Sequence, residues 1–151
     1  MMPNDTKPNT KVQPKTLTEA LIAFHNTGAS AKKSGKNPHF KSNYATLEEV
    51  IDTARLATEY GITFTQLIDF EENIIFVRTK IMHISGEELE SRTPVMTPDM
   101  SNPQKMGSGI TYAKRYGLQS AFGLPSEDDD GNLAASKTGE VRNPVQSQGA
   151  F

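Results

Sequence analysis

The chain has 151 residues, a net charge of −2 and no cysteine. This length favours a single domain, and the lack of cysteine excludes a disulfide scaffold, a thiolate zinc site and a cysteine nucleophile. No apolar run approaches the about 18 residues of a membrane span, and residues 1–15 lack the apolar stretch of a signal peptide. We therefore expect a cytoplasmic protein that makes no membrane contact.

Composition divides the chain into three parts. Residues 1–15 are polar and contain three prolines, so we expect a disordered N-terminal segment. Residues 16–125 hold most of the hydrophobic side chains and are expected to fold as one domain. Residues 126–151 are first acidic and then polar, and we expect a flexible tail.

Two helices are predicted at the start of the domain, each from a capping box. Thr16 and Glu19 begin the first, which fades at Gly28, and its apolar stripe consists of Leu17, Ala20, Leu21 and Phe24. Thr46 and Glu49 begin the second, which Gly61 should stop, and its stripe consists of Leu47, Val50, Ile51, Ala54 and Ala57. A loop rich in glycine and proline is expected between them.

The apolar period then changes from helical to alternating, which predicts three strands. Ile62, Phe64, Ile68 and Phe70 line one face of the first strand. Residues 71–73 turn the chain into a second strand at 74–84, and Ser85–Gly86 turns it into a third strand at 87–95. Strands joined by such short turns are antiparallel neighbours.

A last helix is predicted at residues 103–122, with Pro103 in its first turn. The element order ααβββα predicts an α+β domain, in which helices pack on one face of a three-stranded antiparallel meander. One side of the last helix is small and apolar, and consists of Met106, Ile110, Ala113, Gly117 and Ala121. The opposite side is polar and consists of Lys105, Ser108, Tyr112, Arg115 and Gln119, with Tyr116 at its margin.

Charge is segregated along the chain. No carboxylate lies between Glu19 and Glu48 or between Asp99 and Glu127, and these two windows hold seven of the lysines and arginines and three of the 4 tyrosines. Proteins that bind single-stranded nucleic acid combine cations for the phosphates with aromatic rings that stack on bases. We expect the two windows to fold side by side into one positive channel. The candidate DNA-binding residues are Lys32, Lys33, Lys36, Asn37, His39, Phe40, Lys41, Tyr44, Lys105, Ser108, Tyr112, Lys114, Arg115 and Tyr116.

Other interpretations of these windows stay open. The last helix is also compatible with an ordinary solvated polar face, and the loop with a surface loop whose Phe40 and Tyr44 pack into the core. A metal-dependent nuclease built on the acidic residues 127–130 is one alternative function, and an adaptor that binds an acidic protein is another.

Several signals of catalysis fail on inspection. Residues 28–34 resemble a P-loop, but Lys33 stands where its second glycine belongs. Residues 127–132 resemble a calcium loop, but Lys137 would occupy the position of its bidentate glutamate. The three histidines have no metal-ligand spacing. We therefore expect no enzyme activity, no cofactor and no metal.

Four segments in this order resemble a known family. They are Lys36–Leu47 (KNPHFKSNYATL), Ser85–Glu87, Gly107–Tyr116 (GSGITYAKRY) and Glu127–Asn132 (EDDDGN). Together they resemble the phage and prophage single-strand annealing proteins of the Erf (essential recombination function) family.

The resemblance implies ATP-independent annealing of complementary DNA strands by a homo-oligomer, either a ring or a filament. It also implies a core similar to that of single-strand annealing recombinases, and partners such as a phage exonuclease or a host single-strand-binding protein. Residues 36–44 and Ser108, Tyr112, Lys114 and Arg115 become the DNA contacts by position. The partner-binding domain of longer relatives is expected to be reduced here to the polar tail.

Overall fold

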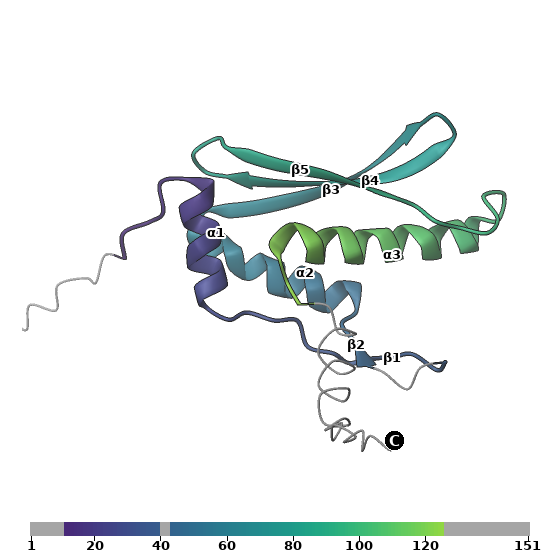
Figure 1. Cartoon of the computed structure of the whole chain (residues 1–151), viewed down its shortest axis with the longest axis horizontal. Coiled ribbons are helices and arrows are strands. Elements are labelled where there is room, and N and C mark those ends of the chain that lie inside the picture. The colour runs from purple at the N-terminus through teal and green to yellow at the C-terminus, as the bar shows by residue number, and fades with distance from the viewer. Residues whose placement is uncertain (1–10, 40–42, 126–151) are drawn as a thin grey trace, which may run out of the picture.

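The computed structural model describes residues 11–39 and 43–125 (Figure 1). The disorder expected for residues 1–10 and the flexible tail expected for residues 126–151 therefore concern residues outside the described part of the chain. The elements are α1 (Leu17–Asn26), β1 (Gly35–Lys36), β2 (Asn43–Tyr44), α2 (Leu47–Arg55), the short 3₁₀ helix η1 (Leu56–Tyr60), β3 (Ile62–Glu71), β4 (Ile74–His83), β5 (Glu88–Pro94) and α3 (Pro103–Phe122). The α+β class and the order ααβββα are confirmed, with the small β1–β2 ribbon as an addition.

The main sheet is an antiparallel meander in the order β3-β4-β5. Its first hairpin is tighter than predicted, because Glu71 pairs with Ile74 and only two residues form the turn. Both turn residues have positive φ, 48° at Glu72 and 62° at Asn73. This is the backbone that a two-residue hairpin requires, since its twist matches that of the strands.

The helix starts follow the predicted caps, with one difference. At Thr46 the capping box is complete, because Thr46 and Glu49 exchange side-chain and backbone hydrogen bonds. At Thr16 only half of the box forms: the Thr16 hydroxyl accepts from the Glu19 N–H, but the Glu19 carboxylate accepts from the N–H of Lys15. A cap that satisfies orphan N–H groups stabilises a helix by about 1 kcal/mol.

The long helix α3 has the bounds that the sequence predicts. The Asn102 side chain accepts from the N–H groups of Gln104 and Lys105, and Pro103 occupies the first turn. At the other end Gly123 adopts a left-handed conformation with φ 63°. The Leu124 N–H then bonds to the Gln119 carbonyl at 2.9 Å, so the chain reverses and buries Leu124 in the core.

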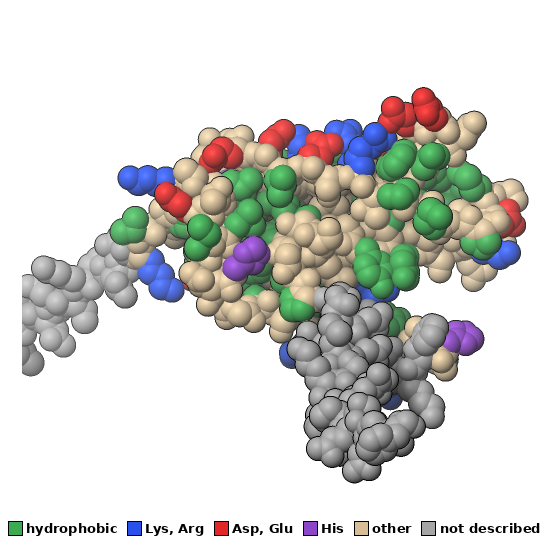
Figure 2. All heavy atoms as spheres, viewed as in Figure 1, with side chains coloured by type: hydrophobic (Ala, Val, Ile, Leu, Met, Phe, Trp, Pro, Cys, Tyr) green, Lys and Arg blue, Asp and Glu red, His purple; other side chains and the backbone are tan. Residues whose placement is uncertain are grey.

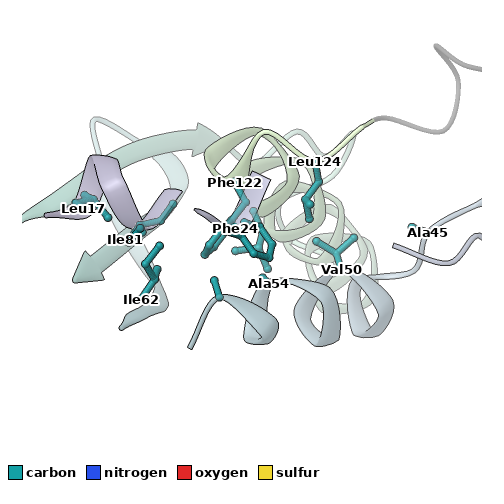
Figure 3. Packing of buried hydrophobic residues seen from close by; sticks show 12 residues of the cluster. Leu17, Phe24, Ala45, Val50, Ala54, Ile62, Ile81, Phe122 and Leu124 are labelled. Atoms are coloured by element: carbon teal, nitrogen blue, oxygen red, sulfur yellow. The ribbon is translucent and has the colours of Figure 1, made fainter. Parts of the chain in front are cut away.

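The domain has a sheet, then α3, then α2 as successive layers (Figure 1). The predicted apolar stripe of α3 faces the sheet, where Ala113 and Gly117 are buried. The main core lies where α1, α2 and the end of α3 meet the sheet (Figure 3). At its centre the ring of Phe122 makes edge contacts with those of Phe24 and Phe64, both at 5.7 Å between centroids.

The far half of β3 extends past this core. Ile68 and Phe70 lie on the helix-facing side of the strand, as predicted, because they pair with Val77 and Ile75. They are nevertheless 57% and 63% exposed. Figure 2 shows hydrophobic side chains gathered at this end of the sheet. The alternating apolar pattern continues to the end of β3, but the helices do not cover this end of the strand.

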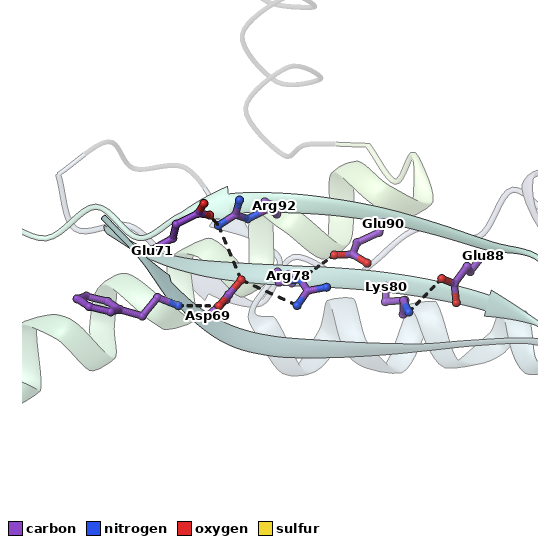
Figure 4. A network of polar contacts seen from close by, with 8 residues as sticks. Asp69, Glu71, Arg78, Lys80, Glu88, Glu90 and Arg92 are labelled. Atoms are coloured by element: carbon purple, nitrogen blue, oxygen red, sulfur yellow. Dashed lines mark hydrogen bonds and ion pairs between the residues drawn. The ribbon is translucent and has the colours of Figure 1, made fainter. Parts of the chain in front are cut away.

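The outer face of the sheet carries a network of ion pairs (Figure 4). Arg78 contacts Glu90 at 2.7 Å, Arg92 contacts Glu71 at 2.6 Å, and Lys80 contacts Glu88 at 3.1 Å. Asp69 lies 3.9 Å from Arg78 and 3.8 Å from Arg92, and so joins the first two pairs. The cations of this face are thus engaged by carboxylates of the same face.

No helix among residues 11–39 and 43–125 has the length and apolar character needed to cross a membrane.

Candidate nucleic-acid interface

The first acid-free window forms a small ribbon that the sequence did not predict. Gly35 pairs with Tyr44, and Lys36 pairs with Asn43, as antiparallel neighbours. Each strand of the ribbon has only two residues, which is too short for an alternating pattern to be recognised in the sequence. Gly35 and Pro38 therefore predict only a loop. The ribbon places Lys36 and Asn37 at its far end and Tyr44 at its base.

Arg115 joins this ribbon to α3. Its guanidinium carbon lies 4.7 Å from the ring centroid of Tyr44, 4.7 Å from that of Tyr116 and 5.1 Å from that of Tyr112. All three distances fall within the about 6 Å range of a cation–π contact. Nη1 of Arg115 also donates to the carbonyl of Ala45, with 3.5 Å between the two atoms. The two acid-free windows therefore meet through one arginine and three tyrosines, while the positive channel expected between them stays a prediction.

The two tyrosines of α3 form a pair on the helix surface. Tyr112 and Tyr116 are one turn apart, their ring centroids are 4.5 Å apart, and their hydroxyls are 3.3 Å apart. Tyr112 is 57% exposed, whereas Tyr116 is half-buried. The pair thus presents the Tyr112 ring to solvent and supports it from the protein side.

Close packing at Gly35 fixes the ring of Tyr44. A Cβ atom at position 35 would lie 2.7 Å from both Cε2 and Cζ of Tyr44. Carbon atoms in contact sit about 3.5–4.0 Å apart, so any side chain at this position would displace the ring. Only glycine fits here, and the fit keeps Tyr44 against Arg115.

A carboxylate secures the base of the ribbon. The Glu49 carboxylate accepts from the N–H of Ser34 at 3.4 Å and from the N–H of Thr46 at 2.8 Å. Hydrogen bonds from the Ser34 side chain and then from the Thr46 backbone hold the pKa of Glu49 below its usual range. This acid is ionised at neutral pH, and its role is to join the ribbon to the start of α2.

The predicted cations differ in their exposure. Lys32, Lys33, Lys36, His39, Lys105 and Ser108 are exposed, while Asn37 and Lys114 are half-buried. The Lys114 backbone carbonyl accepts a hydrogen bond from the Gln66 side chain at 3.0 Å, so the backbone of α3 at this position lies beside β3. Arg115 is only 8% exposed. Phe40 and Lys41 lie outside the described residues.

The polar side of α3 is therefore divided along its length. Lys105, Ser108 and Tyr112 share the open half, and the helical rise of 1.5 Å per residue puts Lys105 about 10 Å from Tyr112 along the axis. Arg115 and Gln119 occupy the covered half, where α2 and the ribbon pack. Among the described residues the amide of Gln119 has no hydrogen-bond partner.

Two positions in this cluster had no signal in the sequence analysis. Ala45 contributes a backbone carbonyl, which any residue type would supply. Gly35 was one of several loop glycines, and its contact with Tyr44 depends on the strand pairing. Once the pairing of the two short strands is known, a glycine opposite an aromatic residue indicates that the ring packs over the glycine.

Within the described ranges, no group of three or more histidine, aspartate or glutamate side chains is arranged to hold a metal ion. The acidic run at 127–130, on which the nuclease alternative depends, lies outside these ranges.

The fold and the cluster define a small α+β domain in which a lysine-bearing ribbon packs on a tyrosine-bearing helix. The profile of the ERF superfamily matches residues 17–150, and the chain belongs to that superfamily. The resemblance inferred from the four segments is confirmed, and it associates the chain with phage recombination by single-strand annealing. Comparisons with curated proteins and with solved structures found no match.

Proposed function

We propose that this protein binds single-stranded DNA and anneals complementary strands without ATP, in the cytoplasm of a bacterial host. The observation that carries the proposal is the meeting of the two acid-free windows at Arg115, beside the exposed ring of Tyr112. The exposed lysines of the two windows and the exposed Tyr112 ring suit a flexible strand that offers both phosphates and unpaired bases. Residues 16–125 form the binding domain in this proposal, and the protein acts as a binding protein rather than an enzyme.

Different residues would serve the two parts of the strand. Lys36 and Lys105 are exposed and suited to phosphates, while Tyr112 presents a ring on which any base can stack. Contacts to phosphates carry no sequence information, so base edges stay available for pairing with a second strand. Annealing needs this division, because the protein must hold a strand without reading it.

Copies of the chain are proposed to assemble along the strand. One domain makes few contacts, and linked copies raise the effective concentration of each next contact. The exposed end of β3, with Ile68 and Phe70, is the surface proposed to meet a second copy, because a patch of core-type side chains on a sheet edge marks an interaction site. An interface that joins unlike surfaces of two copies generates a ring or a filament.

The variant Phe70→Asp tests this surface. We expect it to sediment at lower mass than the wild type while its circular dichroism is unchanged, because Phe70 is already 63% exposed within one chain. Leu67→Asp is the matched control, since Leu67 is 49% exposed on the same strand but on its other face. A wild type that is monomeric at micromolar concentration, with and without single-stranded DNA, contradicts the proposed assembly.

Pairing of two complementary labelled oligonucleotides tests the function itself. We expect faster pairing with protein and without nucleotide, and binding to poly-dT whose log affinity falls with log salt by about 0.7 per neutralised phosphate. Lys36→Ala should weaken binding to all sequences alike. Lys11→Ala should not, because Lys11 is an exposed lysine outside both windows that contacts Glu59.

Two outcomes would favour the other functions. Cleavage of labelled DNA in the presence of magnesium would support a nuclease. Lack of binding to poly-dT at low salt would contradict DNA binding and favour the adaptor.

A further inference from the structure

We propose that Arg115 is a positioning residue, which holds the β1–β2 ribbon against the tyrosines of α3 and neutralises no phosphate. This inference rests on the proposed binding of single-stranded DNA and assigns a role within that site. It differs from what the family resemblance implies for Arg115, namely a direct DNA contact.

The burial of Arg115 is the first step of the argument. A side chain that neutralises a phosphate must present its guanidinium to solvent, where the strand passes. Arg115 is 8% exposed, and its charged end lies among the rings of Tyr44, Tyr112 and Tyr116. Lys36 and Lys105, by comparison, are exposed. The residues available to phosphates are therefore the neighbours of Arg115, not Arg115 itself.

The chemistry of the cluster explains why an arginine stands here. The planar guanidinium stacks on aromatic faces and is weakly hydrated, whereas the lysine ammonium is compact and strongly hydrated. One guanidinium contacts three rings that come from two distant parts of the chain. Tyr44 and Tyr112 are separated by 67 residues of sequence, so only the fold brings these rings together. A lysine at this position keeps the charge but loses the planar surface.

The position of the cluster connects it to the site. Tyr44 is the last residue of the ribbon whose other end carries Lys36, and Ala45, which accepts from Arg115, directly precedes the helix cap Thr46. Tyr112, whose ring is exposed, also contacts the guanidinium, with 5.1 Å between its carbon and the ring centroid. Loss of Arg115 should therefore loosen the ribbon and the exposed ring together, while every cation that faces solvent remains.

Salt dependence distinguishes a positioning residue from a phosphate contact. Affinity for a labelled dT oligonucleotide is measured at several salt concentrations for the wild type, Arg115→Ala, Arg115→Lys and Lys105→Ala. We expect Lys105→Ala to make the slope of log affinity against log salt shallower by about 0.7. We expect Arg115→Ala to bind roughly twofold to thirtyfold more weakly with the slope of the wild type, since a cation–π contact contributes about 0.5–2 kcal/mol.

The conservative variant gives the second criterion. Arg115→Lys should bind as weakly as Arg115→Ala, because the stacking surface is absent from both. A shallower slope for Arg115→Ala, or affinity restored by lysine, would overturn the inference in favour of a phosphate contact. If Arg115→Ala does not fold, Tyr44→Leu takes its place, because this variant removes one ring of the cluster and no charge. We expect it to bind more weakly than the wild type with an unchanged salt slope.

A measurement without DNA separates this inference from the proposed function. Trypsin cleavage after Lys36 should be faster in Arg115→Ala than in the wild type, because the ribbon is no longer held. Equal cleavage rates would overturn the positioning role even if the protein binds DNA. Faster cleavage in a protein whose wild type does not bind poly-dT would support the structural role and refute the function.

Discussion

Replacing Gly35 by alanine tests the cluster with the smallest possible change. The new Cβ would lie 2.7 Å from Cε2 and Cζ of Tyr44 and 2.9 Å from Cδ2. Ordinary carbon contacts are about 3.5–4.0 Å, so the ring or the strand must move by about 1 Å. The ring then cannot keep its 4.7 Å distance to the Arg115 guanidinium carbon.

The expected loss follows from that one contact. A cation–π contact contributes about 0.5–2 kcal/mol, which corresponds to about a twofold to thirtyfold weaker affinity if the cluster positions the ribbon for DNA. Fluorescence anisotropy with a labelled dT oligonucleotide measures the affinity, and thermal unfolding followed by circular dichroism shows that the domain stays folded.

Gly107→Ala is the matched control for this experiment. A Cβ at position 107 meets nothing within 4 Å, and the residue is exposed on α3. Alanine should stabilise the helix there by about 1 kcal/mol and leave binding unchanged. Wild-type affinity in a folded Gly35→Ala protein would refute the reasoning, because the cluster would then tolerate displacement of Tyr44.

Two further changes test the fold. Gly117→Ala should lower the free energy of unfolding by about 1–3 kcal/mol in a urea titration, because its Cβ would lie 2.8 Å from Oγ1 of Thr93 and 3.1 Å from Oγ1 of Thr79; an unchanged midpoint would contradict the close approach of α3 to the sheet. The pKa of Glu87 is lowered, first by the Leu17 N–H and then by the Ser85 hydroxyl, so its stabilising contribution is present above the ordinary glutamate pKa and is lost as pH falls through the lowered value. Glu87→Gln should therefore reduce the difference in melting temperature between neutral and acidic pH, and an equal difference in both proteins would show that this carboxylate does not link α1 to the β4–β5 turn.

Local chemistry explains why the sequence predicted most of the fold. Threonine caps, Pro103 and the glycines at 61 and 123 act within a few residues of where they stand, so helix ends can be inferred without the tertiary structure. The alternation of β3 likewise reports which side chains share a face.

The differences arise where the outcome depends on distant parts of the chain. The polar side of α3 is one continuous face in the sequence, but Arg115 and Gln119 are buried because α2 and the ribbon cover its second half. Ile68 and Phe70 share a pattern with the buried Ile62, yet α3 does not extend over them. Periodicity identifies a face, whereas the position of other elements decides whether that face is covered.

The same limit applies to the candidate site. Two windows without carboxylates were sufficient to predict that the ribbon and α3 belong together. Which cation faces solvent and which is enclosed by rings depends on side-chain packing: Lys36 and Lys105 are exposed, whereas Arg115 is 8% exposed and lies among three tyrosine rings.

The ion pairs on the outer face of the sheet have a consequence for how the molecule meets a polyanion. Four carboxylates and three cations of that face neutralise one another at short range and leave a small negative excess. A polyanion approaching from this side is repelled, while the side of the ribbon and α3 offers cations. The Debye length is about 8 Å at physiological ionic strength, so this asymmetry orients the encounter only over the last few water layers and fades further as salt is added.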